Sequence, residues 1–146
     1  MRHRIEVLHG VNLDQLGVRP AAHYGTVTLN ELEYEIDAYA RELGCELVTF
    51  QTNSETEYVE RLHRSREISD GLILNPGAWT HYSWAIRDAL EIAGLPAVEV
   101  HLSDVASREE WRSVSVIREL CFATIAGKGV DGYREALDLL AAKLGE

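Results

Sequence analysis

Apolar residues in this chain gather in short runs, which are separated by stretches with a different spacing. Short runs rich in Val, Ile and Leu are typical of strands that are buried in a parallel sheet. Turn-forming residues such as Asn75-Pro76-Gly77 end at least one of these runs. The runs predict strands over Ile5–Leu8, Glu46–Phe50, Leu72–Leu74, Ala97–Leu102 and Leu120–Ala126.

Between the runs, apolar residues recur at every third or fourth position, which is the spacing of an amphipathic helix. One such stripe consists of Leu29, Leu32, Ile36, Ala40 and Leu43, and Gly44 follows it as a residue suited to end a helix. Thr28 and Glu31 have the spacing of a capping box at its start. The same reasoning predicts a long polar loop from His9 to about Val27, a helix capped by Ser54 with Glu57, a helix over Ser83–Ala93, a short helix opened by Ser107 with Glu110, and a closing helix over Tyr133–Leu144.

Strand and helix patterns alternate along the whole chain. Such alternation indicates a parallel sheet, because each connection between parallel strands needs a crossover that is usually a helix. Right-handed crossovers leave few topologies open. We therefore expect an α/β fold, a flavodoxin-like doubly wound five-stranded parallel sheet with helices on both faces.

The composition is that of one globular domain over residues 1–146. The chain is 46% hydrophobic and 26% charged, which are ordinary values for a globular protein. Its formal net charge of −10 argues against nucleic acid or an anionic membrane as a partner. It does not exclude a small anionic substrate, because salt screens the field of the whole molecule over roughly 8 Å and a few arginines can dominate a pocket.

The cysteines and the start of the chain favour a cytoplasmic protein. The opening Met-Arg-His-Arg leads directly into a predicted strand and lacks the apolar region of a signal peptide. No apolar run approaches the ~18 residues of a membrane span. Cys45 and Cys121 stand beside apolar segments without metal-ligand spacing, so we interpret them as reduced core residues rather than as a disulfide.

Unusual polar residues follow several of the predicted strands. In open parallel sheets, ligands bind outside the carboxyl ends of the strands, where such residues meet. A single loop histidine is usually a solvated surface residue, so the indication of a site comes from the convergence of several. They are His9, Asn12, Arg19, His23 and Tyr24 after the first strand, Asn75, Thr80 and His81 after the third, and His101 and Ser103 at the end of the fourth.

The fourth strand places two ionisable side chains on the same face. Glu99 and His101 alternate with Val98, Val100 and Leu102, so both point to one side of the sheet. One interpretation is a buried Glu–His pair that only ties down a helix. The other is that Glu99 orients and charges His101, which would then act as a general acid near neutral pH.

Several well-known chemistries lack their motifs here. There is no G-x-S-x-G elbow, no G-x-x-x-x-G-K-[ST] loop and no H-E-x-x-H pair. A phosphate-receiver domain would need acidic residues where His9-Gly10 and Asn75 stand, and a flavin loop would need Ser or Thr within Gly10–Leu16. No carboxylate–histidine cluster has ligand spacing, so we expect no metal.

Six segments around the polar residues have the order and content of known motifs. They are His9–Arg19 continuing through His23-Tyr24-Gly25, Asn75–His81, Ala85–Ala89, Val98–Ser103, Arg108-Glu109 through Arg112, and the ending Gly127 to Gly132-Tyr133. The first four resemble the four principal motifs of the type II 3-dehydroquinate dehydratases. The similarity covers nearly the whole chain in the right order.

This resemblance implies a reaction and a role for each catalytic residue. The reaction is the reversible removal of water from 3-dehydroquinate to give 3-dehydroshikimate, through an enolate and without a cofactor, in aromatic biosynthesis. By resemblance, Tyr24 is the general base, Arg19 beside it favours the tyrosinate, and Asn12 helps to hold a water against the enolate oxygen. His101 is the general acid that protonates the departing hydroxyl, with Glu99 behind it.

The resemblance also implies binding residues and an assembly. Asp88 would reach the site of a neighbouring subunit, because the family forms trimers that are grouped into dodecamers. We therefore expect a large homo-oligomer. The residues that would grip the carboxylate and hydroxyls of a small anionic substrate are Asn75, His81, Leu102, Ser103 and Arg112.

Departures from the family pattern leave two alternatives open. One is a lyase or isomerase that acts on a related hydroxylated cyclohexane carboxylate, and the other is a catalytically silent paralogue that binds such a ligand as an oligomeric scaffold. The presence of Tyr24, Arg19 and His101 together argues against silence, since binding alone needs neither a base nor an acid. The departures are Val11 for proline, Asp14-Gln15 for Asn-Leu, Pro20 for an acidic residue, Trp79 for tyrosine, Trp84 for a small apolar residue, and Arg118-Glu119 for Ser-Pro.

Overall fold

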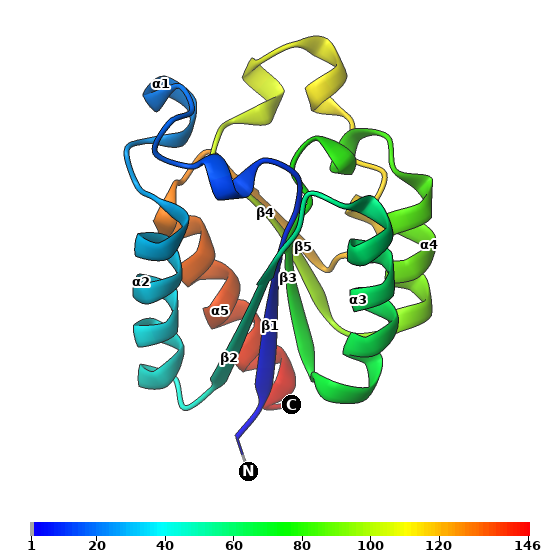
Figure 1. Ribbon diagram of the computed structural model, residues 1–146. Coiled ribbons are helices and arrows are strands. Elements are labelled where there is room, and N and C mark those ends of the chain that lie inside the picture. Colours follow the sequence, from blue (N-terminus) through cyan, green and yellow to red (C-terminus); the bar gives the residue numbers. More distant parts are fainter. Residues whose placement is uncertain (1) are drawn as a thin grey trace.

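The computed structural model describes residues 2–146 and contains a five-stranded parallel sheet in the order β2-β1-β3-β4-β5 (Figure 1). This is the doubly wound flavodoxin-like order, so the predicted fold class is confirmed. The strands are β1 (Arg4–His9), β2 (Glu46–Gln51), β3 (Gly71–Asn75), β4 (Ala97–His101) and β5 (Ala123–Ala126). The helices are α1 (Ala21–Tyr24), α2 (Leu29–Glu42), α3 (Glu55–Ile68), α4 (Trp84–Ala93) and α5 (Val130–Leu144).

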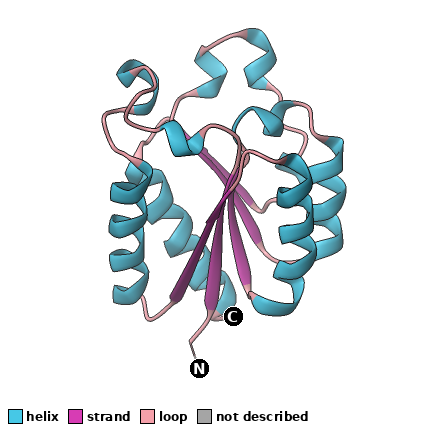
Figure 2. Cartoon of the chain, viewed as in Figure 1, coloured by secondary structure: helices cyan, strands magenta, loops and turns pink. Residues whose placement is uncertain are grey.

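Helices cover both faces of the sheet, and each face has its own core. Figures 1 and 2 show α2 and α5 on one side of the sheet and α3 and α4 on the other. Successive residues of a strand point to opposite faces. Thus Ile5, Val7 and Ile73 pack toward α2 and α5, whereas Leu72 and Leu74 pack toward α3 and α4.

The helices α2 and α3 begin at the predicted caps. Thr28 Oγ1 accepts the backbone N–H of Glu31, and the Glu31 carboxylate accepts the N–H of Thr28, which completes the capping box of α2. Ser54 and Ser83 cap α3 and α4 through their hydroxyls. Gly44 follows α2 with a φ of 77°, a conformation that glycine adopts without strain.

Glu6 is one of two fully buried carboxylates on the described strands, the other being Glu99 of β4. Glu6 of β1 accepts hydrogen bonds from Ser65 Oγ at 2.6 Å and from Ser69 Oγ at 2.9 Å, and it also pairs with Arg61 of α3. A buried carboxylate needs such partners, since an unpaired charge there would be costly. This cluster ties β1 to α3.

Short 3-10 turns account for most differences between the predicted and observed elements. The segment from His9 to Val27 is not a continuous loop, because it contains η1 (Leu13–Gln15) and the short helix α1. The prediction that Ser107 caps a helix was wrong. Ser107 instead ends η3 (Val105–Ser107), and its hydroxyl donates to the carbonyl of Asp104, while η4 (Glu110–Ser113) starts without a side-chain cap.

The last strand and the last helix also have different limits from those predicted. β5 begins at Ala123 rather than at Leu120, because Arg118–Leu120 forms the turn η5. α5 begins at Val130 rather than at Tyr133, directly after Gly129. The remaining turn, η2 (Gly77–His81), follows β3.

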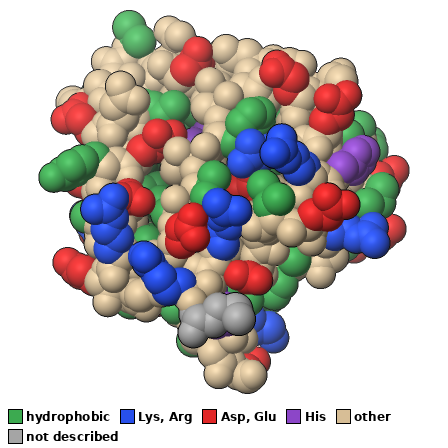
Figure 3. Space-filling view, turned by 60° about the horizontal axis from the view of Figure 1, so that its bottom comes forward, with side chains coloured by type: hydrophobic (Ala, Val, Ile, Leu, Met, Phe, Trp, Pro, Cys, Tyr) green, Lys and Arg blue, Asp and Glu red, His purple; other side chains and the backbone are tan. Residues whose placement is uncertain are grey.

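The helices, the charged surface and the two cysteines can be compared with what the sequence predicts. Within residues 2–146, no helix combines the length and the apolar character that crossing a bilayer requires. Figure 3, which brings the lower end of Figure 1 forward, shows acidic and basic side chains interspersed on that face. Cys45 and Cys121 are free thiols, and burial raises the pKa of Cys121 to about 12.

Candidate active site

A pocket opens at the carboxyl ends of the strands, where the predicted polar residues converge. The loops after β1, β3 and β4 all contribute to it, in accordance with the general rule for open parallel sheets. Three of its lining residues are arginines, and none of the described lining residues carries a carboxylate, so the pocket favours an anionic ligand. The lining is Val11, Asn12, Leu13, Arg19, Tyr24, Asn75, Gly77, Ala78, His81, His101, Leu102, Ser103, Val105, Arg108 and Arg112.

Tyr24 is held by two guanidinium groups. Arg19 Nη2 donates to Tyr24 Oη at 2.7 Å, and Arg108 Nη1 donates to the same oxygen at 2.6 Å. Arg19 also lies over the tyrosine ring, with its guanidinium carbon 3.9 Å from the ring centroid. Two cationic donors on one oxygen stabilise negative charge there. The predicted Arg19–Tyr24 contact is therefore present, and a second arginine joins it.

The prediction assigned no role to Arg108, although it lies in a segment that matched a motif. Arg108 Nη1 contacts Tyr24 Oη and also Ser103 Oγ, at 3.3 Å. It thereby links the loop after β1 to the end of β4. The sequence shows two arginines in this segment, Arg108 and Arg112. Their positions in the sequence do not indicate which of the two reaches Tyr24.

His101 and Glu99 form the expected pair inside the sheet. His101 Nε2 lies 2.5 Å from Glu99 Oε2, and the Glu99 side chain is fully buried. Burial opposes ionisation of this carboxyl, but the hydrogen bonds from His101, Thr80 and Ser115 together with the His101 charge lower its pKa below the ordinary value. Glu99 is therefore an anion at neutral pH. It gives the His101 ring a fixed orientation and an acceptor on the side away from the pocket.

His81 lies against His101 at the edge of the pocket. The two rings are stacked with centroids 6.3 Å apart, and His81 Nδ1 lies 2.6 Å from the carbonyl oxygen of Val114. A carbonyl accepts but cannot donate, so His81 Nδ1 carries a proton. Burial lowers the pKa of His81, opposed in part by this hydrogen bond. A neutral His81 then presents Nε2 as an acceptor for a hydroxyl.

Two asparagines line the pocket. Asn12 has an unusual backbone conformation, and the side chain of Asn75 is fixed by hydrogen bonds. Asn12 has a φ of 68° and is the one non-glycine residue with positive φ in the described chain, a conformation that asparagine tolerates better than most residues. Asn75 Nδ2 donates to Tyr133 Oη at 3.1 Å, and Asn75 Oδ1 accepts from the N–H of Gly77. Burial raises the pKa of Tyr133 to about 12, so Tyr133 stays a neutral phenol.

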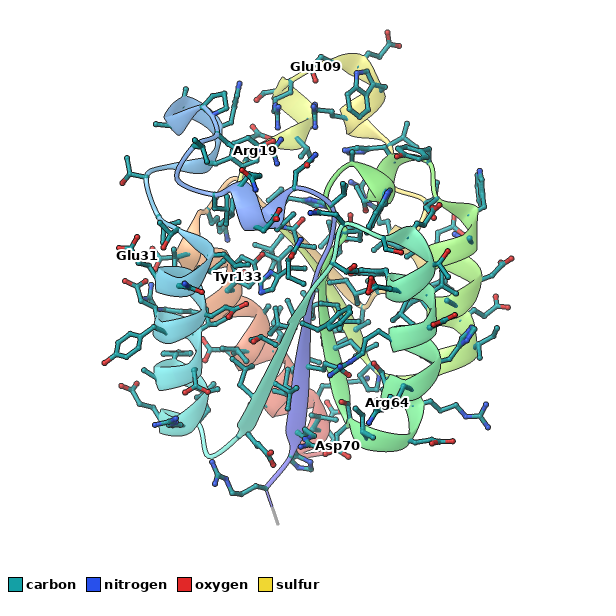
Figure 4. All side chains as sticks on the ribbon, viewed as in Figure 1. Arg19, Glu31, Arg64, Asp70, Glu109 and Tyr133 are labelled. Atoms are coloured by element: carbon teal, nitrogen blue, oxygen red, sulfur yellow. The ribbon has the colours of Figure 1, made fainter. Side chains whose placement is uncertain are left out.

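The segment after β4 supplies further pocket residues. Leu102 and Ser103 line the pocket directly after His101. Arg112 lines it as well, and Glu109 fixes this arginine through an ion pair with its Nε atom. Figure 4 shows Arg19 and Glu109 near the same end of the molecule, above the sheet. Arginines from two separate segments are thereby concentrated around one opening.

Five polar residues from the sequence prediction do not line this pocket, namely His9, His23, Thr80, Asp88 and Glu99. Asp88 is exposed on α4 and is not a lining residue. His9 is fully buried, with Nε2 at 3.4 Å from a carboxylate oxygen of Glu33 and its ring 6.3 Å from that of Tyr133. The expectation that His9 belongs to the rim of the site was wrong, because its side chain points into the core between β1 and α2.

The departures from the family motifs lie mostly outside the pocket. Val11 lines it, and its carbonyl oxygen stands 2.6 Å from the position that a Cβ on Gly77 would take. Pro20 is the residue before α1, and Trp84 is exposed at the start of α4. Trp79 is buried edge-on against Tyr58. Of the substituted residues, Val11 alone is in a position to alter the pocket directly.

Comparisons with known proteins give a consistent result. The family described as "Dehydroquinase class II" matches residues 3–141. A curated 3-dehydroquinate dehydratase of Pelotomaculum thermopropionicum is 49% identical over 97% of this chain and 99% of its own length, and one of Syntrophotalea carbinolica is 49% identical over 95% and 93%. The crystal structure of a type II dehydroquinase from Propionibacterium acnes superposes with a TM-score of 0.93 at 42% identity, covering 97% of this chain and 98% of that one. The chain therefore belongs to the class II dehydroquinase family and is an enzyme of the type II 3-dehydroquinate dehydratases.

Proposed function

We propose that this enzyme catalyses the reversible dehydration of 3-dehydroquinate to 3-dehydroshikimate through an enolate, with Tyr24 as general base and His101 as general acid. Family membership supports the overall reaction. The observation that carries the assignment of the base is the pair of guanidinium groups that donate to Tyr24 Oη. We further propose that the whole of residues 1–146 forms one catalytic domain in the cytoplasm and serves aromatic biosynthesis.

In the first step, Tyr24 Oη takes a proton from the carbon next to the substrate ketone. The electron pair of the broken C–H bond moves toward the carbonyl oxygen and gives an enolate. Arg19 and Arg108 stabilise the charge that Tyr24 Oη carries before it accepts the proton. Asn12, which lines the same pocket, holds a water against the enolate oxygen.

In the second step, the enolate collapses and expels the β-hydroxyl as water. The C–O bond breaks, and His101 supplies the proton that the leaving oxygen needs. Because Glu99 occupies Nε2 of this ring, the nitrogen that serves the pocket is Nδ1. Before the next turnover Tyr24 releases its proton to solvent and His101 takes one up from solvent, so the enzyme is unchanged and the net reaction releases one water.

Substrate anchoring follows from the charge of the lining. The carboxylate of the substrate suits Arg112, which Glu109 holds in place, and the ring hydroxyls suit Asn75, His81 and Ser103. Leu102 supplies an apolar surface for the carbocycle. A pocket with three arginines and several neutral hydrogen-bonding groups is complementary to a small hydroxylated carboxylate.

We propose that the chain works as trimers grouped into a dodecamer, in which Asp88 serves the pocket of a neighbouring subunit. Asp88 lies on α4, beside large apolar side chains that are exposed in the single chain: Tyr82 at 57%, Trp84 at 64% and Ile92 at 53%. Exposed aromatic residues of this size are typical of surfaces that are covered in an assembly.

The experiment that tests the function follows enone absorbance after mixing the purified protein with 3-dehydroquinate. The expected result is a rise in absorbance that needs no added cofactor. A folded protein that gives no signal at any pH would exclude the proposed reaction. In that case a related hydroxylated cyclohexane carboxylate would be the next substrate to assay.

A further inference from the structure

Two hydroxyl groups outside the pocket donate to the buried carboxylate of Glu99. Thr80 Oγ1 donates to Glu99 Oε2 at 2.6 Å, the same oxygen that His101 contacts. Ser115 Oγ donates to the other oxygen, Oε1, at 2.8 Å. Thr80 is completely buried, and neither hydroxyl lines the pocket. These groups therefore act on the active site only through Glu99.

A short segment after η4 connects these hydroxyls to the rest of the site. Residues 114–116 run alongside η2, and two contacts join them to η2 while a third reaches β4. The N–H of Val116 donates to the carbonyl of Thr80 at 2.8 Å, the carbonyl of Val114 accepts from His81 Nδ1, and Ser115 reaches Glu99. This segment directly follows the turn that contains Arg112. The substrate-gripping segment and the proposed acid are thereby parts of one hydrogen-bonded unit.

The donors determine which member of the Glu99–His101 pair holds a proton. Each of the three partners of Glu99 donates, so the carboxylate is used as an acceptor only. A protonated Glu99 would have to give up one of these hydrogen bonds, because a carboxylic acid has one acceptor fewer. Removing a hydroxyl would raise the proton affinity of the carboxylate, and the proton would move from His101 toward Glu99. A neutral His101 would keep only the proton on Nδ1 and would be a much weaker acid than the cation, so it would protonate a leaving hydroxyl less readily.

We propose that Thr80 and Ser115 are positioning residues that keep the shared proton on His101 by donating to both oxygens of Glu99. This inference rests on the proposed role of His101 as general acid. The titratable and charged groups that face the pair are His81 from η2, Arg112 from η4, Tyr58 from α3 and Cys121 after η5. Tyr58 and Cys121 stay neutral, because burial raises the pKa of each.

The test compares Thr80→Val, Thr80→Ser and Ser115→Ala with the wild-type enzyme. Valine has nearly the shape of threonine but cannot donate, whereas serine keeps the hydroxyl. Ser65→Ala is the matched control, since Ser65 donates to the buried carboxylate of Glu6 far from the pocket. It removes the same kind of hydrogen bond and is expected to lower stability without changing kcat.

Thr80→Val loses one hydrogen bond to a charged group, so we expect its kcat to be ~10- to 100-fold lower than that of the wild type. Its KM should be unchanged. Thr80→Ser should have a kcat close to that of the wild type. Exchange of the α-proton of the substrate with solvent deuterium should continue in Thr80→Val, because Tyr24 is untouched. Ser115→Ala should show the same pattern and provides the result if Thr80→Val does not fold. A folded Thr80→Val with wild-type kcat, or one in which exchange falls as much as kcat, would overturn the inference.

A second readout does not depend on turnover. In the free enzyme, the ¹⁵N signals of the His101 ring report its protonation, and Thr80→Val should shift them toward the neutral form at a pH where the wild type is cationic. Identical titrations in the two proteins would refute the positioning role. A wild-type enzyme without activity would refute the proposed function instead, and the ring signals would still decide the location of the proton.

Discussion

At the scale of single residues, Tyr24 accepts hydrogen bonds from two arginines of separate loops. Arg19 and Arg108 donate to its oxygen at 2.7 Å and 2.6 Å. We expect Arg19→Ala and Arg108→Ala each to lower kcat by ~10- to 100-fold, the size of one lost hydrogen bond to a charged group. Because both arginines act on one oxygen, the double variant should lose less than the product of the single losses.

Steady-state kinetics of the four proteins measures this coupling. Arg64→Ala is the control, since Arg64 is exposed on α3 and lies at the end of the molecule opposite to Arg19 (Figure 4). It should retain wild-type kcat. Strictly multiplicative losses in the double variant would show that the two arginines do not act through the same oxygen.

The residue scale also shows where prediction from sequence reached its limit. The spacing of Glu99 and His101 predicted their shared face, because a strand has a fixed period of two. Arg108 lies in a segment of irregular backbone between η3 and η4, where no period relates sequence position to direction. Its contact with Tyr24 depends on the folded path of two loops, which the sequence alone did not reveal.

At the scale of elements, the ends of β1 and β3 fit together through a glycine. A Cβ on Gly10 would lie 2.2 Å from the carbonyl oxygen of Pro76, and backbone atoms cannot move away cheaply. Gly10→Ala should therefore destabilise the protein by about 1–3 kcal/mol or more, as overpacking does. Because Asn12 and Asn75 flank this contact, kcat should fall as well.

Chemical denaturation and kinetics of Gly10→Ala and Gly44→Ala separate the two effects. Gly44 has a φ of 77° and no atom near the added Cβ, so Gly44→Ala should cost only the left-handed strain of roughly 1–2 kcal/mol. It lies at the other end of β2 from the pocket and should leave kcat unchanged. A Gly10→Ala protein with wild-type stability would contradict the close packing of the two loops.

We expect the network that joins β4, η2 and residues 114–116 to make stability depend on pH. The pKa of Glu99 is lower in the folded protein than the ordinary carboxyl value. A lowered folded pKa contributes stability that is fully present above the unfolded value of about 4.3 and is lost as the pH falls through the folded pKa. The difference in unfolding free energy between wild type and Glu99→Gln should therefore shrink below about pH 4. A difference that is constant from pH 3 to 7, measured by urea titration, would contradict an ionised Glu99.

The regular elements were easier to predict than the turns. Hydrophobic periods and caps gave α2, α3, α4 and the five strands to within a few residues. The 3-10 turns were missed, because they are too short to show a period and are held by tertiary contacts. Ser107 illustrates this, since a capping-box spacing was present but its hydroxyl bonds to the carbonyl of Asp104.

At the scale of the whole molecule, the proposed assembly has a direct test. If Asp88 serves a neighbouring pocket, each pocket takes Tyr24 from one subunit and Asp88 from another. The variants Asp88→Asn and Tyr24→Phe then remove residues that different subunits contribute to the same pocket. Mixed oligomers of these two inactive variants should then regain part of the wild-type activity, because some pockets combine an intact Tyr24 with an intact Asp88 from the neighbour. The activity of proteins that are refolded together, compared with that of the separately refolded variants, measures this.

A complementary measurement is the mass in solution. The wild type should elute with a mass twelve times that of the chain, and Trp84→Glu should dissociate it, because a charge on the exposed face of α4 would be buried without a partner. A monomeric wild type with full activity would refute both the assembly and the role of Asp88.

The central claim is that Tyr24 removes the α-proton and that His101 serves only the departing hydroxyl. It is tested most directly by following deuterium uptake into 3-dehydroquinate in D₂O with His101→Ala and Tyr24→Phe. A positioned general base contributes ~10²–10⁴ in rate, so Tyr24→Phe should lose both exchange and dehydration by at least that factor. His101→Ala should lose dehydration but retain exchange. Exchange that persists in Tyr24→Phe would contradict the account and assign the proton transfer to another group.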